Sequence, residues 1–244
     1  MGAADKFILK IQRAETPGYR FLKRLIKTVF NPPGVSVPAF LKPAGRLLYE
    51  FHFFVITFFR GLTGFFYRQP LFQSRCASVG KNLRIEGLPY VNGPIRIELG
   101  DNVSLGGNVT ILSGRFFDQP TLTIWDRSAV GWNTTISVNL EVTIEEDVII
   151  SYDCRISDTD GHPRDALKRA QHLPQDITDI KPVHICRYAW IGNGTHIMKG
   201  VTIGEGAIIG ANSVVINDVP AYAIAMGNPA EVFFRNINKT RTQA

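Results

Sequence analysis

The sequence predicts a mainly β fold, a parallel β-helix in which the chain winds into a three-sided prism, and three observations support it. Branched aliphatic residues recur every six positions without a break from Ile185 to Val215. The same period, with two-residue slips, runs through most of the chain from Val79 onward. Gly and Asn recur between the apolar positions, where a coiled chain must turn. An α-helix cannot satisfy a strict six-residue apolar period, whereas in a prism every sixth residue points toward the axis.

Charge and aromatic content divide the chain into two kinds of sequence. The net charge is +6 over 244 residues, yet residues 1–78 hold 12 of the 27 Lys and Arg and only 3 of the 21 acids. The same residues hold 12 of the 16 Phe. We therefore predict an extension over residues 1–78, a β-helix over 79–220 with a loop at 157–184, and a C-terminal tail over 221–244.

The extension begins with amphipathic helix patterns. Residues 21–30 read FLKRLIKTVF, which places apolar side chains on one face of a helix and Lys23, Arg24 and Lys27 on the other. The aromatic-rich segment 47–66 is interrupted by Glu50 and Arg60, so it is a poor candidate for a membrane-spanning helix.

Two interpretations of this extension remain open. The helices lie in an anionic membrane surface, held by their apolar face and by lysine and arginine. Alternatively, they pack on the β-helix or on neighbouring subunits. Binding to nucleic acid is disfavoured because the basic residues alternate with bulky aliphatics and do not line a polar face.

The β-helix follows from Val79 in segments of constant period. Three sides of six residues give a coil of 18, so the repeats amount to roughly six coils. Residues 157–184 interrupt the period, and long loops in compact domains are usually functional. The inward positions expected from the period are Val79, Ile85, Val91, Ile97, Leu99, Leu105, Ile111, Ile124, Val130, Ile136, Ile144, Ile150, Ile156, Ile185, Ile191, Ile197, Ile203, Ile209 and Val215.

The cysteines indicate the compartment. Cys76, Cys154 and Cys186 are widely spaced and form neither a CxxC pair nor a disulfide framework, which favours a reducing environment. No segment is typical of a cleavable signal peptide. We therefore expect a cytoplasmic protein, peripheral at the inner face of the cell membrane.

Several motifs resemble those of the hexapeptide-repeat acyltransferases, which fold as left-handed β-helices, and in particular the sugar O-acetyltransferases related to galactoside and maltose acetyltransferases. The resemblance covers residues 79–237. Its most specific motifs are Asp160-Gly161-His162-Pro163, Trp190-Ile191-Gly192, the run from Lys199 to Gly204, and Val219-Pro220 with Gly227-Asn228-Pro229-Ala230.

The resemblance implies that His162 is the general base that deprotonates the acceptor hydroxyl for attack on acetyl-CoA. An imidazole suits this role because it is available as a neutral base at cellular pH. Asp160 or Asp158 would orient the ring, and the sequence does not choose between them; Asp158 is also a candidate for substrate binding. The alternative is that His162 is an ordinary exposed loop residue.

Further site residues are implied in the same way. Asn133 resembles a family asparagine that binds the acceptor, although an asparagine in a corner turn fits equally well. The coenzyme would contact Trp190, Asn193 and Ala211, with Gly227 near by. Relatives often carry lysines before the Asp-Val-Pro and after the Asn-Pro-Ala motifs, where this chain has Asn217 and Glu231; Arg235 and Lys239 are candidates to supply the charge.

A metal site is not expected. Zinc enzymes of this fold need three convergent histidines, and His184 and His196 each precede an inward aliphatic residue, so both point outward. Twelve residues separate them, which places them on different faces of the prism.

The sequence therefore predicts a homotrimeric, acetyl-CoA-dependent O-acyltransferase that acts on a sugar hydroxyl in a surface polysaccharide or glycolipid precursor. Acyl transfer is expected to be direct, because no cysteine or serine lies in a nucleophile motif. The alternatives are an N-acyltransferase acting on a nucleotide-linked amino sugar, which uses the same fold and histidine, and a non-catalytic trimeric β-helical scaffold.

Overall fold

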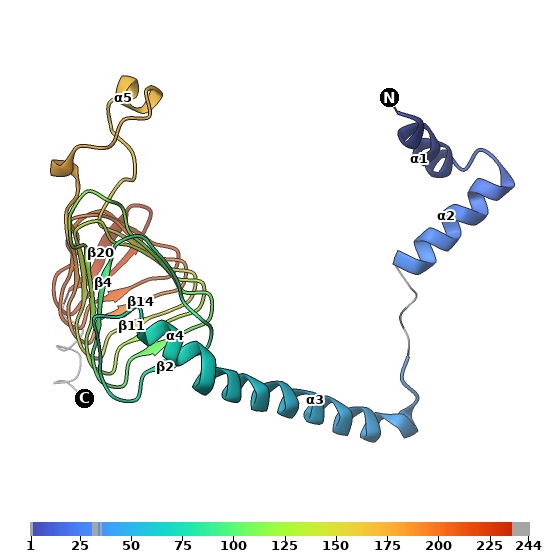
Figure 1. The fold of residues 1–244 in the computed structure, drawn as a ribbon, viewed down its shortest axis with the longest axis horizontal. Helices are drawn as coiled ribbons and strands as arrows, with labels where there is room; N and C mark the ends of the chain where they lie inside the picture. The colour runs from blue at the N-terminus through green and yellow to red at the C-terminus, as the bar shows by residue number, and fades with distance from the viewer. Residues whose placement is uncertain (1, 31–33, 35, 236–244) are drawn as a thin grey trace. The chain divides into compact units, whose positions relative to one another are not determined.

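The chain divides into two units, Met1–Thr57 and Phe58–Ala244, which are described separately. The computed structural model describes residues 2–30, 34 and 36–235. Figure 1 shows helices in the first part of the chain and a stack of strands in the second. Among the described residues, no helix combines the length and the apolar character that crossing a bilayer requires.

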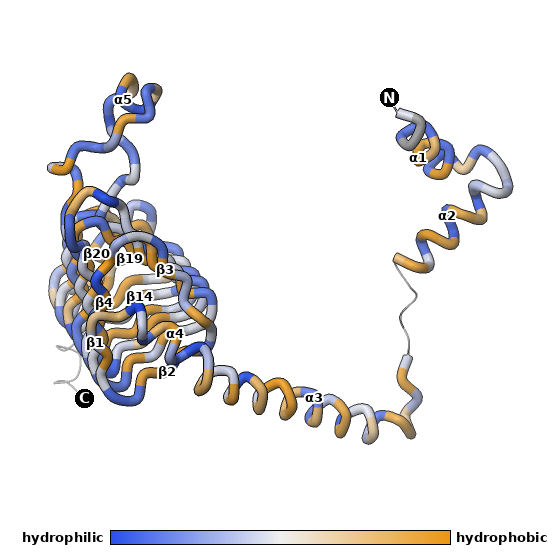
Figure 2. Tube along the Cα trace, in the orientation of Figure 1, coloured by the Kyte–Doolittle hydropathy of each residue, from blue (hydrophilic) through white to orange (hydrophobic). Residues whose placement is uncertain are grey.

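The first unit is helical, as the amphipathic pattern predicts. It contains α1 (Ala3–Arg13), α2 (Pro17–Phe30) and the short helix η1 (Ala39–Leu41). The helix α3 (Lys42–Thr63) begins in this unit. α1 and α2 contact each other through an edge-to-face pair between Phe7 and Tyr19, whose ring centroids are 6.1 Å apart. Figure 2 shows hydrophobic and hydrophilic residues alternating along α2.

The second unit begins within α3, and two short helical segments that follow this helix cover the first coil. These are η2 (Gly64–Arg68) and α4 (Gln69–Gln73). Phe72 of α4 is fully buried in the same core as the first coil. Gln69 donates a hydrogen bond to the Leu83 carbonyl at 3.1 Å. Residues 64–77 therefore act as a cap, which solenoids need because their terminal coil has no neighbour to bury its face.

Three sheets form the sides of the prism. The first runs β1 (Ser78–Val79), β4 (Arg96–Leu99), β7 (Thr121–Ile124), β10 (Glu141–Ile144), β13 (Val183–Ile185) and β16 (Thr202–Ile203). The second runs β2 (Arg84–Ile85), β5 (Ser104–Leu105), β8 (Ala129–Val130), β11 (Ile149–Ile150), β14 (Trp190–Ile191), β17 (Ile208–Ile209), β19 (Ala223–Gly227) and β20 (Ala230–Arg235). The third runs β3 (Tyr90–Asn92), β6 (Thr110–Leu112), β9 (Thr135–Ser137), β12 (Arg155–Ser157), β15 (His196–Ile197) and β18 (Val214–Val215). We call these the first, second and third sheets.

The core confirms the six-residue period. Equivalent aliphatic residues stack in register from coil to coil, as in the series Ile124, Ile144, Ile185 and Ile203. All the expected inward residues are buried except Val79 and Val91, which lie in the first coil and are half-buried. The two-residue slips have a simple cause: strands such as β4 turn two side chains inward rather than one, and these are Ile97 and Leu99.

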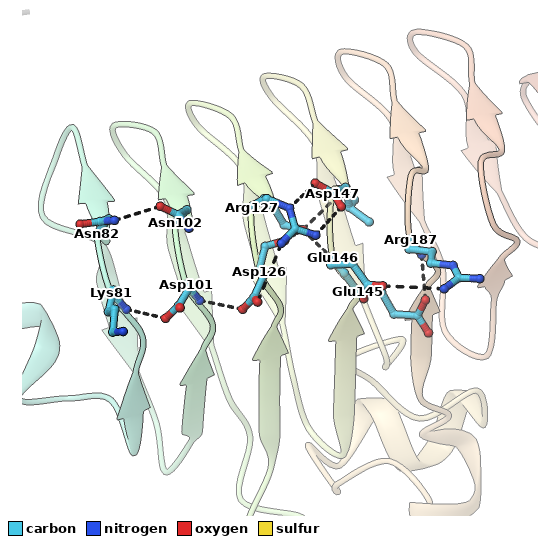
Figure 3. A network of polar contacts seen from close by, with 12 residues as sticks. Lys81, Asn82, Asp101, Asn102, Asp126, Arg127, Glu145, Glu146, Asp147 and Arg187 are labelled. Carbon is cyan, nitrogen blue, oxygen red and sulfur yellow. Dashed lines mark hydrogen bonds and ion pairs between the residues drawn. The ribbon is translucent and has the colours of Figure 1, made fainter.

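Polar contacts join the coils at the corner between the first and second sheets. The backbone N–H of Asp101 donates to the Asp126 carboxylate at 2.7 Å, and the N–H of Lys81 donates to the Asp101 carboxylate at 2.7 Å (Figure 3). One coil further, Arg127 pairs with Asp147 at 2.6 Å. The Asp101 and Asp126 carboxylates thus satisfy backbone donors that a solenoid corner leaves without a ladder partner, while Arg127 and Asp147 add an ion pair between side chains.

The six-residue period ends in two places. After β12 the chain leaves the prism in a loop that contains α5 (Ala166–Ala170) and η3 (Ile177–Asp179) and stands away from the coils (Figure 1). After the last coil, β19 joins the second sheet and β20 pairs with it antiparallel. The fold is the left-handed parallel β-helix that the sequence predicts, with a helical N-terminal extension.

Candidate functional site

The expelled loop and a second insertion leave the prism at the same corner, between the third and first sheets. Residues 158–182 connect β12 to β13, and residues 113–120 connect β6 to β7 two coils earlier. Between them, the coil of β9 and β10 has only a short connection at 138–140. The irregular chain of the β-helix is therefore concentrated on one corner, and His162 lies there.

Asp158 fixes the start of the loop to the short connection. Its carboxylate is fully buried and accepts hydrogen bonds from the backbone N–H groups of Asn139 at 2.8 Å, Leu140 at 2.6 Å and Glu141 at 3.0 Å. Burial raises the pKa of the Asp158 carboxyl even though these bonds oppose the shift. Both oxygens thus accept hydrogen bonds from the protein's own backbone, and these bonds fix the start of the loop to residues 139–141.

A turn over residues 159–161 presents His162. The Thr159 hydroxyl oxygen accepts the Gly161 N–H at 3.0 Å and also accepts a hydrogen bond from the Gln175 side-chain amide. Gly161 has φ of +79°, a left-handed conformation that glycine adopts without strain. His162 itself is exposed, and among the described residues its ring has neither a hydrogen bond nor an ion pair. The backbone before the imidazole is held firmly, while the ring is open to a substrate.

Asp160 lies in a cluster of four charged side chains. Its carboxylate is 2.6 Å from Lys199 Nζ and 3.2 Å from Arg164 Nε, and Asp179 lies 4.0 Å from both cations. Partial burial pulls the pKa of Asp160 upward, but the bonds from Lys199 and Arg164 outweigh burial and leave that pKa below its usual range. Neither Asp160 nor Asp158 has a hydrogen bond to His162 in this structure; both carboxylates have other partners.

The remaining predicted residues lie elsewhere on the prism. Asn133 and Asn193 are at the corner between the second and third sheets, and Ala211 follows one coil after Asn193 at the same corner. Asn133 has φ of +58°, and its side-chain amide donates to Asp153 and accepts from Asn108. These contacts are those of a corner asparagine in a ladder.

Trp190 and the C-terminal hairpin complete the predicted coenzyme residues. Trp190 lies half-exposed on β14, and its indole N–H donates to the Ser151 hydroxyl at 3.3 Å. The N–H of Gly227, at the end of β19, donates to the Ser213 hydroxyl at 3.1 Å. Arg235 ends β20, and the roles predicted for its side chain and for Lys239 fall outside what the structure describes. One chain therefore does not bring these residues and His162 to the same corner.

The thiols do not resemble nucleophiles. Burial raises the pKa of Cys76 to about 11 and also raises the pKa of Cys154 and Cys186. A thiol attacks as its thiolate, which these environments disfavour.

One group of possible metal ligands is present in the described part of the chain. Donor atoms of Glu145, His184 and Cys186 lie within 4.8 Å of one another, and Glu145 Oε1 is 2.7 Å from His184 Nε2. Figure 3 shows Glu145 beside Arg187, whose backbone N–H donates to it at 2.8 Å. His184 and His196 lie on different sheets, as the sequence indicates.

Three residues at the loop corner were not identified as site residues from the sequence: Lys199, Gln175 and Asn139. Lys199 belongs to a motif that the resemblance covers, but its partner Asp160 lies 39 positions away in the sequence. Only the register of the coils could have indicated this contact from the sequence, because it places the turn after β15, which contains Lys199, beside the start of the loop. Gln175 and Asn139 have no sequence pattern of their own.

Comparisons with known proteins agree with this description. Residues 182–217 match the family model of the bacterial transferase hexapeptide, six repeats. The chain is 30% identical over 171 residues to galactoside O-acetyltransferase of Escherichia coli K12, covering 70% of this chain and 69% of that protein. It is 32% identical over 156 residues to the probable acetyltransferase Rv3034c of Mycobacterium tuberculosis, covering 63% of this chain.

The lengths of the relatives differ. The chain spans only 48% of the Mycobacterium tuberculosis protein and 65% of a putative acetyltransferase of Saccharomyces cerevisiae, YJL218W. Among solved structures, AntD, an N-acyltransferase from Bacillus cereus crystallised with dTDP and 3-hydroxybutyryl-CoA, aligns with a TM-score of 0.54 at 20% identity, covering 73% of this chain and 93% of that one. That likeness concerns the fold. With the match to the Escherichia coli enzyme, the chain belongs to the hexapeptide-repeat acetyltransferase family that includes galactoside O-acetyltransferase.

Proposed function

We propose that this protein transfers an acetyl group from acetyl-CoA to a sugar hydroxyl, with His162 as the general base. The observation that carries the proposal is the contrast at the loop corner. The backbone before His162 is held by the hydrogen bond from Gly161 to Thr159 and by the ion pair between Asp160 and Lys199, whereas the exposed imidazole has no partner in the described residues. A base that takes a proton from a substrate needs this combination of fixed position and accessible nitrogen.

The proposed reaction involves the imidazole of His162, the acceptor hydroxyl and the thioester of acetyl-CoA. The imidazole accepts the proton of the acceptor hydroxyl while the hydroxyl oxygen attacks the thioester carbonyl carbon. The carbon–sulfur bond of acetyl-CoA then breaks, and the departing thiolate takes back the proton held by the imidazolium, which leaves an acetyl ester, CoA and a neutral His162. No step requires an enzyme thiol, consistent with the raised pKa of all three cysteines. Asp160 acts as a positioning residue that ties the turn to Lys199.

The active unit in this proposal is a homotrimer. His162 and the residues predicted to hold the coenzyme lie at different corners of one prism, so a neighbouring chain must bring its own corner to the imidazole. Trp190, half-exposed on β14, offers a flat apolar surface for the pantetheine arm, and exposed corner amides such as Asn193 offer polar contacts. Closed cyclic assemblies produce this juxtaposition at each interface.

We further propose that α1 and α2 bind an anionic membrane surface and that the acceptor is a glycolipid or polysaccharide precursor there. In α2, Phe21, Val29 and Phe30 are exposed, and basic residues occupy the remaining face. An amphipathic helix of this kind lies in the interface of a bilayer, where each nearby lysine or arginine contributes about 1 kcal/mol.

A matched pair of variants tests the catalytic part. His162→Asn and His172→Asn remove two exposed histidines of the same loop. Release of free CoA from acetyl-CoA is followed with a panel of glycosides and with cell lipid extract as acceptors. We expect His162→Asn to lower turnover by about 10²–10⁴-fold at unchanged Tm, and His172→Asn to keep it. Turnover that His162→Asn leaves unchanged would refute the role of His162. Absence of acceptor-dependent CoA release in the wild type would favour a non-catalytic scaffold, and an amide product would favour N-acylation.

Vesicle flotation tests the membrane part on the full chain. We expect binding to phosphatidylcholine vesicles that contain phosphatidylglycerol, and loss of that binding in Phe21→Glu. Lys23→Gln, on the polar face, should weaken binding in low salt without abolishing it. Recovery of Phe21→Glu with the vesicles at the wild-type level would refute the interfacial role of α2.

A further inference from the structure

The two insertions at the loop corner line an open cavity that the reaction above does not use. Its volume is about 980 Å³, at the upper end of the range of roughly 300–1,000 Å³ for small-molecule sites. The residues that line it are Arg115 and Phe116 from the earlier insertion, and Lys168, Leu173, Pro174, Gln175, Asp176, Ile177 and Thr178 from the loop. The predicted coenzyme residues of the same chain belong to another corner, so within one chain this cavity is separate from them.

The walls of the cavity are apolar side chains that remain open to solvent. Leu173 is 44% exposed and Ile177 is 55% exposed, while Phe116 is half-buried. These residues sit on chain expelled from the prism, where no core requires them. An exposed apolar group beside a hollow is typical of a surface that a ligand covers.

The charges of the cavity leave one cation in excess. Lys168 is neutralised by Asp176, whose carboxylate lies 2.8 Å from its Nζ. Arg115 is exposed and forms no ion pair within the part of the chain that the structure describes. A guanidinium beside apolar walls suits a ligand that carries both a negative group and an apolar face, because guanidinium binds carboxylate and phosphate oxygens in pairs.

The wall of the cavity is joined to the turn that carries His162. Gln175 is buried, and its Nε2 donates to the Thr159 hydroxyl oxygen, which also accepts the Gly161 N–H. The Gln175 Oε1 is buried without a hydrogen-bond partner among the described residues. Such an atom is uncommon in folded proteins and marks a place where an ordered water completes the hydrogen bonding.

We propose that this cavity holds the non-reacting part of the acceptor, and that this part is an anionic glycosyl group: a sugar bearing a phosphate or a carboxylate. The negative group binds Arg115, and the apolar face of the sugar packs on Phe116. The proposal rests on the proposed function, since it assigns the specificity of the same corner. The proposal also assigns a role to the hydrogen bond between Gln175 and Thr159. A ligand in the cavity packs against the wall that contains Gln175, and this hydrogen bond then stabilises the turn before His162.

Ligand binding to the full-length protein tests the proposal with defined probes. These are α-D-glucose 1-phosphate, glucuronic acid and the neutral methyl α-D-glucoside, titrated with saturating CoA present so that no probe enters the coenzyme groove. The variants are Arg115→Gln and Phe116→Leu, with Arg84→Gln, an exposed arginine of β2, as the matched control.

We expect the wild type and Arg84→Gln to bind at least one anionic probe about tenfold more tightly than the neutral one, and Arg115→Gln to lose that preference. Phe116→Leu should weaken all probes to a similar extent. If phosphate alone is preferred, the source of the charge is a glycosyl phosphate, and if glucuronic acid alone is preferred, it is an acidic sugar. An equal affinity for charged and neutral probes, or a preference that survives Arg115→Gln, would overturn the proposal.

The outcome is distinguishable from failure of the proposed function. If turnover of acetyl-CoA depends on His162, the proposed function is supported, irrespective of the result for Arg115→Gln. If Arg115→Gln then keeps the preference for anionic probes, only the inference about the cavity is refuted. With any turned-over anionic acceptor, Arg115→Gln should raise KM about tenfold and change kcat little, because the contact is made equally in the ground state and the transition state.

Discussion

The ammonium of Lys199 lies 2.6 Å from the carboxylate of Asp160, although 39 positions separate the two residues. The Lys199 side chain is only 8% exposed, so this pair is better shielded from water than an ordinary surface ion pair. Arg164 and Asp179 extend the contact along the loop. A regular part of the solenoid thus holds the irregular loop at the residue two positions before His162.

Removing the lysine charge should loosen the loop selectively. We expect Lys199→Met to raise amide hydrogen exchange across residues 158–182, corresponding to a loss of about 1–2 kcal/mol, while the core strands keep their protection. Lys81→Met, on the first coil, is the control and should change neither region. Unchanged exchange in the loop of Lys199→Met would show that the pair does not hold it.

The same pair should give the loop a defined pH dependence. Because the folded-state pKa of Asp160 is lowered from its ordinary value of 3.8, the stability contributed by the ion pair is fully present above that value. It is lost as pH falls through the lower folded-state pKa. Titration of the Asp160 carboxyl carbon by NMR should therefore give a midpoint below 3.8, and Lys199→Met should raise it. A midpoint that Lys199→Met leaves in place would contradict the assignment.

The fold could be predicted because one simple pattern determines it. The inward position repeats every six residues, so Ile144, Ile185 and Ile203 are recognisable as stacked partners from their spacing alone. The length and place of the expelled loop follow from where that pattern stops. Even the two-residue slips have a local cause, a strand with two inward side chains.

The contacts of the candidate site were harder to predict from the sequence, because they do not repeat from coil to coil. Asp158 and Asp160 are both possible partners for an imidazole by proximity in sequence, yet one binds the backbone of residues 139–141 and the other binds Lys199. Which partner a carboxylate receives depends on how the loop folds back, and that depends on tertiary contacts such as Gln175 with Thr159. The six-residue period contains no information about how the loop folds back or about which partner each carboxylate binds.

Asp158 should matter for stability more than for chemistry. Asp158→Ala leaves buried backbone N–H groups of residues 139–141 without an acceptor, at a cost of about 2–4 kcal/mol. We expect a fall in Tm of roughly 5–15 °C. Asp176→Ala, which removes an exposed ion pair of the same loop, should change Tm by less than about 2 °C. Equal effects of the two substitutions on Tm would show that the hydrogen bonds from residues 139–141 to Asp158 do not stabilise the fold.

Asn133 offers a way to separate a corner residue from an acceptor ligand. At its φ of +58°, glycine is tolerated and alanine is strained, so Asn133→Ala should cost about 1 kcal/mol more than Asn133→Gly. If the side chain contacts the acceptor, Asn133→Gly should raise KM or lower kcat while Tm stays close to the wild type. If Asn133→Gly leaves both kinetic constants unchanged, the ladder with Asn108 and Asp153 is its whole role.

Direct transfer from acetyl-CoA requires that no enzyme thiol takes part. Because burial raises the pKa of Cys154 and Cys186 as it does that of Cys76, these thiols remain protonated near neutral pH. We expect the triple variant Cys76→Ser, Cys154→Ala, Cys186→Ser to keep turnover within about threefold of the wild type, since no nucleophile is lost. Mass spectrometry of wild-type protein mixed with acetyl-CoA should find no acetylated cysteine during turnover. An acetyl-enzyme that forms and decays at the rate of product formation would replace direct attack with a two-step mechanism.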